Sequence, residues 1–148
     1  MLTSKKVFQS DAENWALVRD IREKVFVIEQ QVPLEEEYDE FDETATHFLV
    51  LLDGKPVGTC RWRFTAKGIK LERYAVLAEA RGNGVGGKLV ELTLADIAEQ
   101  PAATGKKMYL HAQVTAVFLY EKFGFQKEGD QFDECGIMHY KMVKQNSR

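Results

Sequence analysis

Apolar and polar residues alternate along this chain with two different periods. Between residues 12 and 28 the apolar residues fall three or four positions apart, at Trp15, Val18, Ile21, Val25 and Ile28. This period predicts an amphipathic helix that ends near residue 28. Ser10, followed three positions later by Glu13, fits a capping box at its start.

Shorter apolar segments rich in β-branched and aromatic residues predict strands. We expect them at residues 6–8, 47–52, 57–64, 71–77 and 108–110, from 125 onward, and at 137–143. Asp53-Gly54 is a hairpin signal and Gly68 marks the next turn, so the second to fourth strands form a meander. Residues 85–98 and 116–123 carry denser apolar patterns that predict two further helices.

The predicted order is β-α-(α)-β-β-β-α-β-α-β-β, which describes a mixed α/β domain. The bracketed helix falls in the irregular connection after Pro33. No internal repeat, low-complexity linker or Pro/Gly-rich boundary divides the chain, so residues 1–148 are expected to form a single domain. With 148 residues, 45% of them hydrophobic and 29% charged, the chain can bury one core without disulfides or a metal.

Composition narrows the class of protein and the expected compartment. A net charge of −3 gives no basic excess, which argues against a nucleic-acid partner. No apolar stretch reaches the length of a membrane span, and the first residues lack the apolar core of a signal peptide. Cys60 and Cys135 are the only cysteines, so a reduced, cytoplasmic protein is expected. The histidines and cysteines show no metal-ligand spacing, so no metal is expected.

The small net charge hides a division along the chain. From Val25 to Gly54 there is no Lys or Arg, and that segment holds nine acidic residues. The rest of the chain holds 14 acids against 20 bases. One acidic segment is therefore inserted in an otherwise basic chain.

Residues 81–88 form a glycine-rich connection, Arg-Gly-Asn-Gly-Val-Gly-Gly-Lys, between a predicted strand and a predicted helix. Glycines let backbone N–H groups approach an anion closely, and the N-terminus of a helix adds partial positive charge. The segment therefore predicts a phosphate-binding loop. A glycine-rich turn without a ligand is the simpler alternative.

Two nucleotide-binding motifs match this loop only in part. The dinucleotide pattern G-x-G-x-x-G fits from Gly82 to Gly87, but the acid required about 20 residues later is missing near Ala102. The P-loop pattern G-x-x-x-x-G-K also fits, but Leu89 stands where a magnesium-binding Ser or Thr is required. Neither motif is complete.

A third motif fits better. Arg81-x-x-Gly84-x-Gly86 resembles the R/Q-x-x-G-x-G/A signature of the GNAT acetyltransferase superfamily. In that superfamily the loop follows the fourth strand, opens the third helix and binds the pyrophosphate of acetyl-coenzyme A. The predicted strand that ends near Leu77 fits that arrangement.

A second segment resembles the same superfamily. Gln113, Ala116, Tyr120 and Gly124-Phe125 match a GNAT pattern in which Asn is commoner at the position of Gln113. Gln113 and Tyr120 are seven residues apart, which is two helical turns, so both can face one cleft. A tyrosine of the hydrophobic core is the alternative for Tyr120.

Two further patterns resemble the ElaA-like, YjcF-type subgroup of that superfamily. They are Val25-Phe26-Val27-x-Glu29-Gln30-x-Val32-Pro33 with the acids that follow, and Phe132-x-Glu134-x-Gly136-Ile137-x-His139. The resemblance covers nearly the whole chain. It implies a GNAT fold and direct transfer of an acetyl group from acetyl-coenzyme A to a primary amine. It does not define the acceptor, because the subgroup's substrates are mostly undefined.

The resemblance implies roles for particular residues of this chain. The cofactor-binding residues that it implies are Val76, Ala78, Arg81, Gly82, Asn83, Gly84, Val85, Gly86 and Gln113. Backbone N–H groups at Val76 would also stabilise the oxyanion, and Tyr120 would give a proton to the departing thiolate.

Glu72 is the candidate general base. A glutamate on this strand is a recurrent base in the superfamily, although it usually lies two residues earlier, where this chain has Lys70. Side chains alternate along a strand, so Glu72, Tyr74 and Val76 are expected to share one face. An ion pair with Arg61 or Arg63 of the neighbouring strand is the alternative role for Glu72, and a water chain is the alternative base.

Glu29 and Gln30 are the candidate substrate-binding residues, on the acceptor side of the cleft. The acids from Glu35 to Asp42 would wall the same side and attract a cationic amine. Within that segment and just after it, Glu36, Glu40 and Glu43 are expected to be solvated instead. The acceptor would be a small molecule or a peptide, and the resemblance also suggests a homodimer through the C-terminal strands. A non-catalytic acyl-CoA-binding or sensing module with the same fold is the alternative function.

Overall fold

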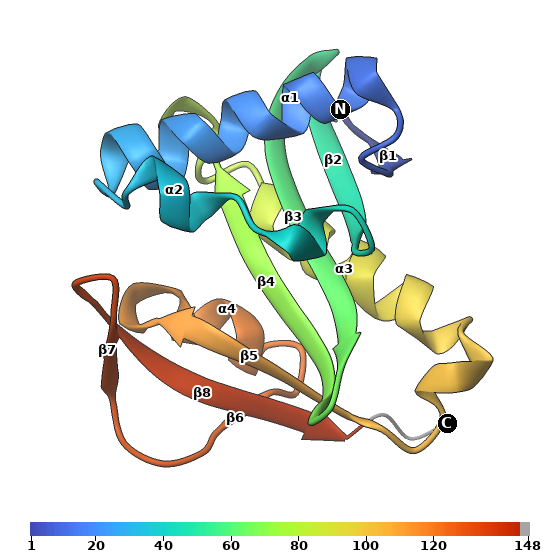
Figure 1. The fold of residues 1–148 in the computed structure, drawn as a ribbon, viewed down its shortest axis with the longest axis vertical. Helices are drawn as coiled ribbons and strands as arrows, with labels where there is room; N and C mark the ends of the chain where they lie inside the picture. Colours follow the sequence, from blue (N-terminus) through green and yellow to red (C-terminus); the bar gives the residue numbers. More distant parts are fainter. Residues whose placement is uncertain (146–148) are drawn as a thin grey trace.

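The computed structural model describes residues 1–145 and shows one mixed sheet flanked by helices (Figure 1). The strands are β1 (Leu2–Val7), β2 (Thr46–Leu52), β3 (Lys55–Thr65), β4 (Gly68–Val76), β5 (Lys107–Gln113), β6 (Gln126–Lys127), β7 (Phe132–Glu134) and β8 (Ile137–Gln145). The helices are α1 (Ala12–Arg22), α2 (Leu34–Glu37), α3 (Val85–Ala98) and α4 (Val117–Glu121), with short helical turns between several elements. Within residues 1–145, no helix has the length and hydrophobicity that a membrane crossing requires.

The sheet is split near its middle. Its strand order is β1-β2-β3-β4-β5-β8-β6, with β7 paired to β8 off this path. β4 and β5 are parallel, whereas the other pairs are antiparallel. The parallel pair joins only residues 69–71 to residues 108–110, so the two strands separate beyond Leu71 and Leu110 (Figure 1).

Helices cover both faces of strands β2 to β4. Two adjacent residues of β3 show the two sides. The Cys60 thiol lies 3.5 Å from the Thr93 hydroxyl of α3, whereas the Arg61 guanidinium contacts Asp42. Asp42 also contacts Arg22 of α1. α3 therefore packs on one face, and α1 with the segment after α2 packs on the other (Figure 1).

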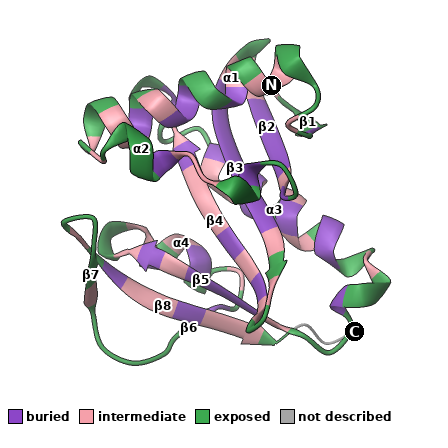
Figure 2. Cartoon of the chain, in the orientation of Figure 1, coloured by how far each residue is buried: buried purple, intermediate pink, exposed green. Residues whose placement is uncertain are grey.

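The core lies between these helices and the sheet, and its positions follow the sequence periods (Figure 2). Val18 and Ile21 of α1 are buried, and so is Leu89 of α3. Trp62 of β3 is buried as well, and its indole N–H donates to Asp96 of α3 at 2.9 Å. The apolar periods of the sequence therefore identify the buried faces of both long helices.

Several element boundaries differ from the prediction. The first strand is β1 rather than residues 6–8, and it pairs with β2 along its whole length. α1 is capped by Asp11, one residue after Ser10, and the Asp11 carboxylate accepts from the backbone N–H three residues later. After α1 the backbone continues as a π-helix over Glu23–Glu29, so the helical segment ends at residue 29.

His47 of β2 is a buried histidine packed between the sheet and α1. Its Nε2 lies 3.0 Å from the Asp42 carbonyl, and its ring meets the Trp15 ring edge-on with 4.8 Å between centroids. Its Nδ1 is buried without a hydrogen-bond partner among residues 1–145. Burial lowers the pKa of His47 to about 4, so its ring is neutral at pH 7.

The protein is expected to lose stability as the pH falls from about 6.5 to about 4. In this window the unfolded chain binds a proton that the folded protein excludes from His47, at a cost of about 3 kcal/mol. Asp39 and Glu72, whose pKa values are lowered to about 2, contribute only below about pH 4.5. Urea denaturation at pH 7, 5 and 4 measures the effect. His47→Gln should flatten the curve above pH 4.5, and an unchanged slope in that variant would contradict the assignment.

Candidate active site

The separated ends of β4 and β5 open into a cleft of about 900 Å³. The glycine loop, residues 81–87, walls one end, which we call the loop end. β4, β5 and α4 wall the middle. α2 and the turn between β7 and β8 wall the other end, which we call the distal end. A long, thin ligand can therefore lie across the split in the sheet.

The glycine loop has the geometry of an anion site. Gly82 and Gly84 have φ angles of +86° and +78°, and a Cβ atom at either residue would meet nothing within 4 Å. The first hydrogen bond of α3 runs from the Lys88 N–H to the Gly84 carbonyl. The N–H groups that come before Lys88 in the first turn of α3 therefore have no acceptor within the helix. Gly86 lets α3 pack closely on α4, because a Cβ atom there would lie 3.1 Å from Leu119 of α4.

Most of the predicted cofactor-binding residues line the cleft. Those that do are Val76, Arg81, Gly82, Gly84, Val85, Gly86 and Gln113. Ala78 and Asn83 are not part of its lining. The Asn83 amide donates to the Ala80 carbonyl at 2.9 Å, so it holds the shape of the loop.

Arg81 and Glu29 form a two-point ion pair at the loop end. Both N–O distances are 2.7 Å, and both side chains are exposed. The hydrogen bond from Arg81 lowers the pKa of Glu29, and the bond to Glu29 raises the pKa of Arg81. Glu29 therefore lies beside the glycine loop and not at the distal end, so this geometry gives no support to its predicted role in binding the acceptor.

Gln30 and Gln113 connect the two sides of the cleft. Each side-chain amide donates to the other, at 2.9 Å and 3.3 Å. Gln30 follows the π-helical segment, whereas Gln113 ends β5. Gln30, predicted to bind the acceptor, and Gln113, predicted to bind the cofactor, are thus hydrogen-bonded to each other.

Tyr120 of α4 lies in the middle of the cleft. Its ring is buried and packs edge-on against Tyr74 and Phe125, with 5.7 Å and 6.2 Å between centroids. Its hydroxyl makes no hydrogen bond with residues 1–145. Burial raises the pKa of Tyr120, so the phenol is neutral at pH 7 and can donate a proton.

A β-bulge changes the facing of side chains along β4. Between Glu72 and Ala75, two residues of β4 lie opposite one residue of β3, and Arg73 has a φ of +58°. The Tyr74 hydroxyl donates to Thr93 of α3 at 2.6 Å, whereas Glu72 contacts arginines on the opposite face. The expectation that Glu72 and Tyr74 share a face is wrong, because the bulge interrupts the alternation of the strand.

Glu72 is held by three cations. Its Oε2 accepts from the Nε atoms of Arg61 and Arg63, each at 2.7 Å, and Lys70 lies 3.2 Å from its Oε1. Burial would raise the pKa of Glu72, but these charges lower it to about 2. A carboxylate with so low a pKa accepts a proton poorly at pH 7. The geometry therefore favours the ion-pair role over the general-base role.

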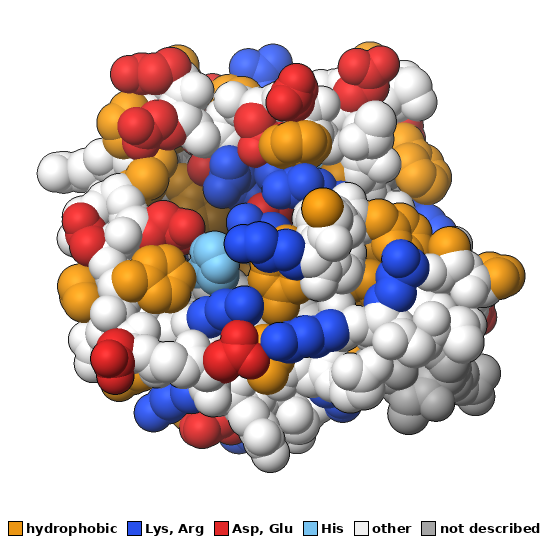
Figure 3. Space-filling model, turned by 60° about the horizontal axis from the view of Figure 1, so that its bottom comes forward, with side chains coloured by type: hydrophobic (Ala, Val, Ile, Leu, Met, Phe, Trp, Pro, Cys, Tyr) orange, Lys and Arg blue, Asp and Glu red, His pale blue; other side chains and the backbone are white. Residues whose placement is uncertain are grey.

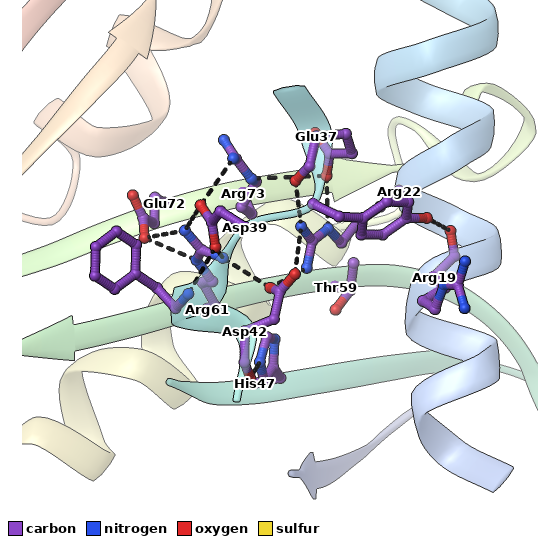
Figure 4. A network of polar contacts seen from close by, with 12 residues as sticks. Arg19, Arg22, Glu37, Asp39, Asp42, His47, Thr59, Arg61, Glu72 and Arg73 are labelled. Atoms are coloured by element: carbon purple, nitrogen blue, oxygen red, sulfur yellow. Dashed lines mark hydrogen bonds and ion pairs between the residues drawn. The ribbon is translucent and has the colours of Figure 1, made fainter. Parts of the chain in front are cut away.

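The last acid of α2 and acids of the segment after it form ion pairs with two buried arginines (Figure 4). Arg22 of α1 contacts Glu37 at 2.6 Å and Asp42 at 2.7 Å. Arg61 contacts Asp39 at 2.8 Å and Asp42 at 2.7 Å. Both guanidinium side chains are 1% exposed. Three acids expected to attract a cationic amine are thus bound to arginines instead.

The distal end of the cleft holds side chains of both charges. They are Glu36, Glu37, Arg73, Glu134, Cys135 and two histidines, His111 and His139. Figure 3 shows a hollow on this side of the molecule, bordered by basic, acidic and histidine side chains. Glu36, expected in a solvated loop, accepts from the Cys135 thiol at 3.3 Å. No group of three or more His, Cys, Asp or Glu residues in the described part of the chain is arranged to hold a metal ion.

Sequence reasoning assigned no catalytic role to His111 or Glu134. Glu134 belongs to the C-terminal pattern noted above, but its partner His111 lies 23 residues earlier on another strand. The C-terminal pattern was therefore a sequence signal for Glu134. The contact with His111 could not be predicted from it, because only the pairing of β5 and β7 with β8 brings the two residues together.

A split parallel pair with a glycine loop at one end of the resulting cleft defines a class of enzyme. The chain belongs to the GNAT acetyltransferase family, since the family model for the acetyltransferase (GNAT) domain matches residues 9–146. A relative from Bacillus subtilis, called uncharacterized N-acetyltransferase YjcF, is 42% identical over 125 residues, which cover 84% of this chain and 87% of that protein.

Solved structures agree with this class. Escherichia coli ElaA is 26% identical with a TM-score of 0.84, and the match covers 97% of this chain and 99% of ElaA. An acyl-CoA N-acyltransferase from Pseudomonas aeruginosa is also 26% identical, with a TM-score of 0.82 and the same coverage. The expected GNAT fold, the likeness to the ElaA-like subgroup and the acyltransferase class are confirmed.

Glu72→Gln is expected to lower the free energy of unfolding by about 2–3 kcal/mol at pH 7. The buried Arg61 would keep its other carboxylates but lose one charged partner. Urea denaturation measures the change. Glu79→Gln, which removes an exposed partner of Lys55, should leave the stability nearly unchanged. A Glu72→Gln protein as stable as the wild type would contradict the ion-pair role.

Proposed function

We propose that this chain transfers an acetyl group from acetyl-coenzyme A to a primary amine, by direct attack of the amine on the thioester. The observation that carries the proposal is the cleft at the split between β4 and β5. It has the glycine loop at one end, a neutral tyrosine in its middle and polar side chains at the other end. Membership of the GNAT family supports the same reaction class.

The residues of the loop end fit the pyrophosphate of coenzyme A. The N–H groups at the start of α3 and its helix dipole favour an anion there. Gly82 and Gly84 keep Cβ atoms out of that space. Val76 and Gln113 border the path from the loop to the middle of the cleft, where the pantetheine arm would lie. Acetyl-coenzyme A bound in this way supplies an acyl group activated as a thioester.

The reaction needs a donor for the oxyanion and a donor for the thiolate. Beyond Leu71, β4 no longer pairs with β5, so backbone N–H groups directed toward β5 have no acceptor on that strand. Val76, at the end of this stretch, is our candidate for stabilising the oxyanion. Tyr120 gives its hydroxyl proton to the thiolate, and the burial of its ring keeps the phenol protonated until then.

The acceptor is an amine of a small molecule or a peptide. The distal end presents carboxylates as well as Arg73, so it suits an amine that also carries polar groups. A cytoplasmic location and a homodimer through the C-terminal strands remain predictions from the sequence.

Gly84→Glu is expected to weaken the binding of coenzyme A at least tenfold, because it adds a carboxylate where the pyrophosphate would lie. Isothermal titration with coenzyme A measures the affinity. Gly54→Glu is a matched control, because Gly54 has a similar φ of +83° and equally open space but lies in the hairpin turn after β2. Equal affinities for the two variants would contradict the loop assignment.

Tyr120→Phe is expected to lower kcat about 100-fold and to leave the KM for acetyl-coenzyme A within a factor of two. The ring keeps its packing, and only the proton donor is lost. Steady-state release of free thiol measures both constants. Tyr109→Phe is the control, because the Tyr109 hydroxyl bonds to Thr65 outside the cleft. An unchanged kcat in Tyr120→Phe would contradict the proton-donor role.

A wild-type protein that binds coenzyme A but acetylates no amine would contradict the enzyme proposal. It would favour the acyl-CoA-binding or sensing module as the function. The panel for this measurement is spermidine, lysine, a short peptide with a free N-terminus, and glucosamine.

A further inference from the structure

Four side chains from three strands gather at the distal end of the cleft. They are His111 of β5, Phe132 and Glu134 of β7, and His139 of β8, and we call them the histidine cluster. Three of them belong to the C-terminal sequence pattern, to which the proposed function gives no role. The cluster therefore calls for a chemical explanation.

Glu134 lies between the two histidines. Its Oε1 is 3.1 Å from Nδ1 of His111, and its Oε2 is 3.7 Å from Nε2 of His139. The Phe132 ring meets the His111 ring edge-on at 5.0 Å between centroids and stacks on the His139 ring at 5.9 Å. The carboxylate and the aromatic ring together fix the orientation of both imidazoles.

The two histidines differ in what their nitrogens can do. Nδ1 of His139 lies 2.7 Å from the Ile137 carbonyl, so a neutral His139 donates its Nδ1–H to that carbonyl and turns the lone pair of Nε2 toward the Glu134 carboxylate, 3.7 Å away. A neutral His111 donates its Nδ1–H to Glu134, which leaves the lone pair on Nε2 available. The His111 side chain is 26% exposed, against 8% for His139. His111 is thus the ring with a free acceptor nitrogen and access to the cleft.

His111 also stands at the right place along β5. It is the residue immediately after Leu110, where pairing with β4 ends. Alternation along β5 puts it on the same face as Gln113, which contacts Gln30 on the α1 side. Tyr120 belongs to α4, which packs on α3. His111 and the proposed proton donor therefore approach the split from opposite faces of the sheet.

Three other ionisable groups that line the cleft are poorly suited to accept a proton. Three cations lower the pKa of Glu72 to about 2. Glu29 is paired with Arg81. The hydrogen bond to Glu36 raises the pKa of the Cys135 thiol, which keeps it protonated at pH 7.

We propose that His111 is the general base for amine acetylation, with Glu134 as its positioning residue; this assignment rests on the proposed function. Nε2 of His111 takes one proton from the ammonium form of the acceptor. The freed lone pair forms the bond to the acyl carbon, and the carbon–sulfur bond breaks. The nitrogen loses its second proton to the Tyr120 phenolate, which has just given its own proton to the departing thiolate. His111 then returns its proton to solvent.

Several charged and titratable groups surround His111. They are Glu134 from β7, Lys141 and His139 from β8, Lys70 from β4, and Tyr109 from β5 itself. Among these groups, Glu134 makes the hydrogen bond to the imidazole, and that bond lowers the pKa of Glu134.

The test is the pH profile of kcat/KM between pH 5.5 and 9.5, with the amine of the panel above that the wild type acetylates fastest. His111→Ala should lower kcat/KM about 100-fold at pH 7. The loss should be smaller at pH 9.5, where more of the amine is already neutral. In this variant the acidic limb of the wild-type profile should be replaced by a rise at higher pH that follows deprotonation of the amine, and added imidazole should restore part of the rate. Thermal denaturation establishes that the variant is folded.

Glu134→Gln tests the positioning role. It should lower kcat several-fold, leave the KM for acetyl-coenzyme A within a factor of two, and keep the acidic limb. Glu128→Gln is the matched control. Glu128 is as exposed as Glu134, at 46% against 45%, and it pairs with Lys107 and Lys141 outside the cleft. Its pH profile should match that of the wild type.

The outcomes separate the two proposals. If the wild type acetylates an amine and His111→Ala keeps the acidic limb, or gains nothing from imidazole, the base assignment is wrong and acetyl transfer stands. Loss of the limb in His139→Gln but not in His111→Ala would also overturn the assignment. A wild type that binds acetyl-coenzyme A and acetylates none of the amines would instead contradict the proposed function itself.

Discussion

The buried charge of Arg61 is the constraint on which the rest of this structure depends. Arg61 lies on β3 and contacts Asp39, Asp42 and Glu72, so it ties the segment after α2 to the strand that lines the cleft. A guanidinium does not lose its proton inside a protein, so its burial requires these carboxylates. One wall of the cleft is therefore held in place by charge compensation as well as by apolar packing.

Two irregularities of β4 create the cleft and determine which side chains face it. Pairing with β5 stops at Leu71, which opens the middle of the sheet. The bulge at Arg73 then directs Tyr74 toward α3 and leaves Glu72 on the opposite face. A regular strand in this position would keep its ladder with β5 and leave no space for a ligand between the two strands.

Local signals explain which features could be predicted. The turn at Asp53-Gly54 and the glycine loop depend on backbone conformations that neighbouring residues determine, so the sequence and the family resemblance placed them correctly. The bulge at Arg73 adds one residue to a strand whose apolar period looks regular, so alternation gave the wrong face for Tyr74. The contact between Cys135 and Glu36 joins residues 99 positions apart, and only the assembled sheet brings them together. The cluster around His111 was missed for the same reason.

The buried ion pairs also weaken the long-range electrostatic field of the acidic segment. A carboxylate held within 3 Å of a guanidinium presents a dipole to the solvent, and the field of a dipole decays faster than that of a charge. Glu37 and Asp42 therefore add little to the long-range attraction of cationic molecules. Any long-range attraction of a cation by this segment is left to its exposed acids, Glu35, Glu40 and Glu43, and dissolved salt screens those exposed charges.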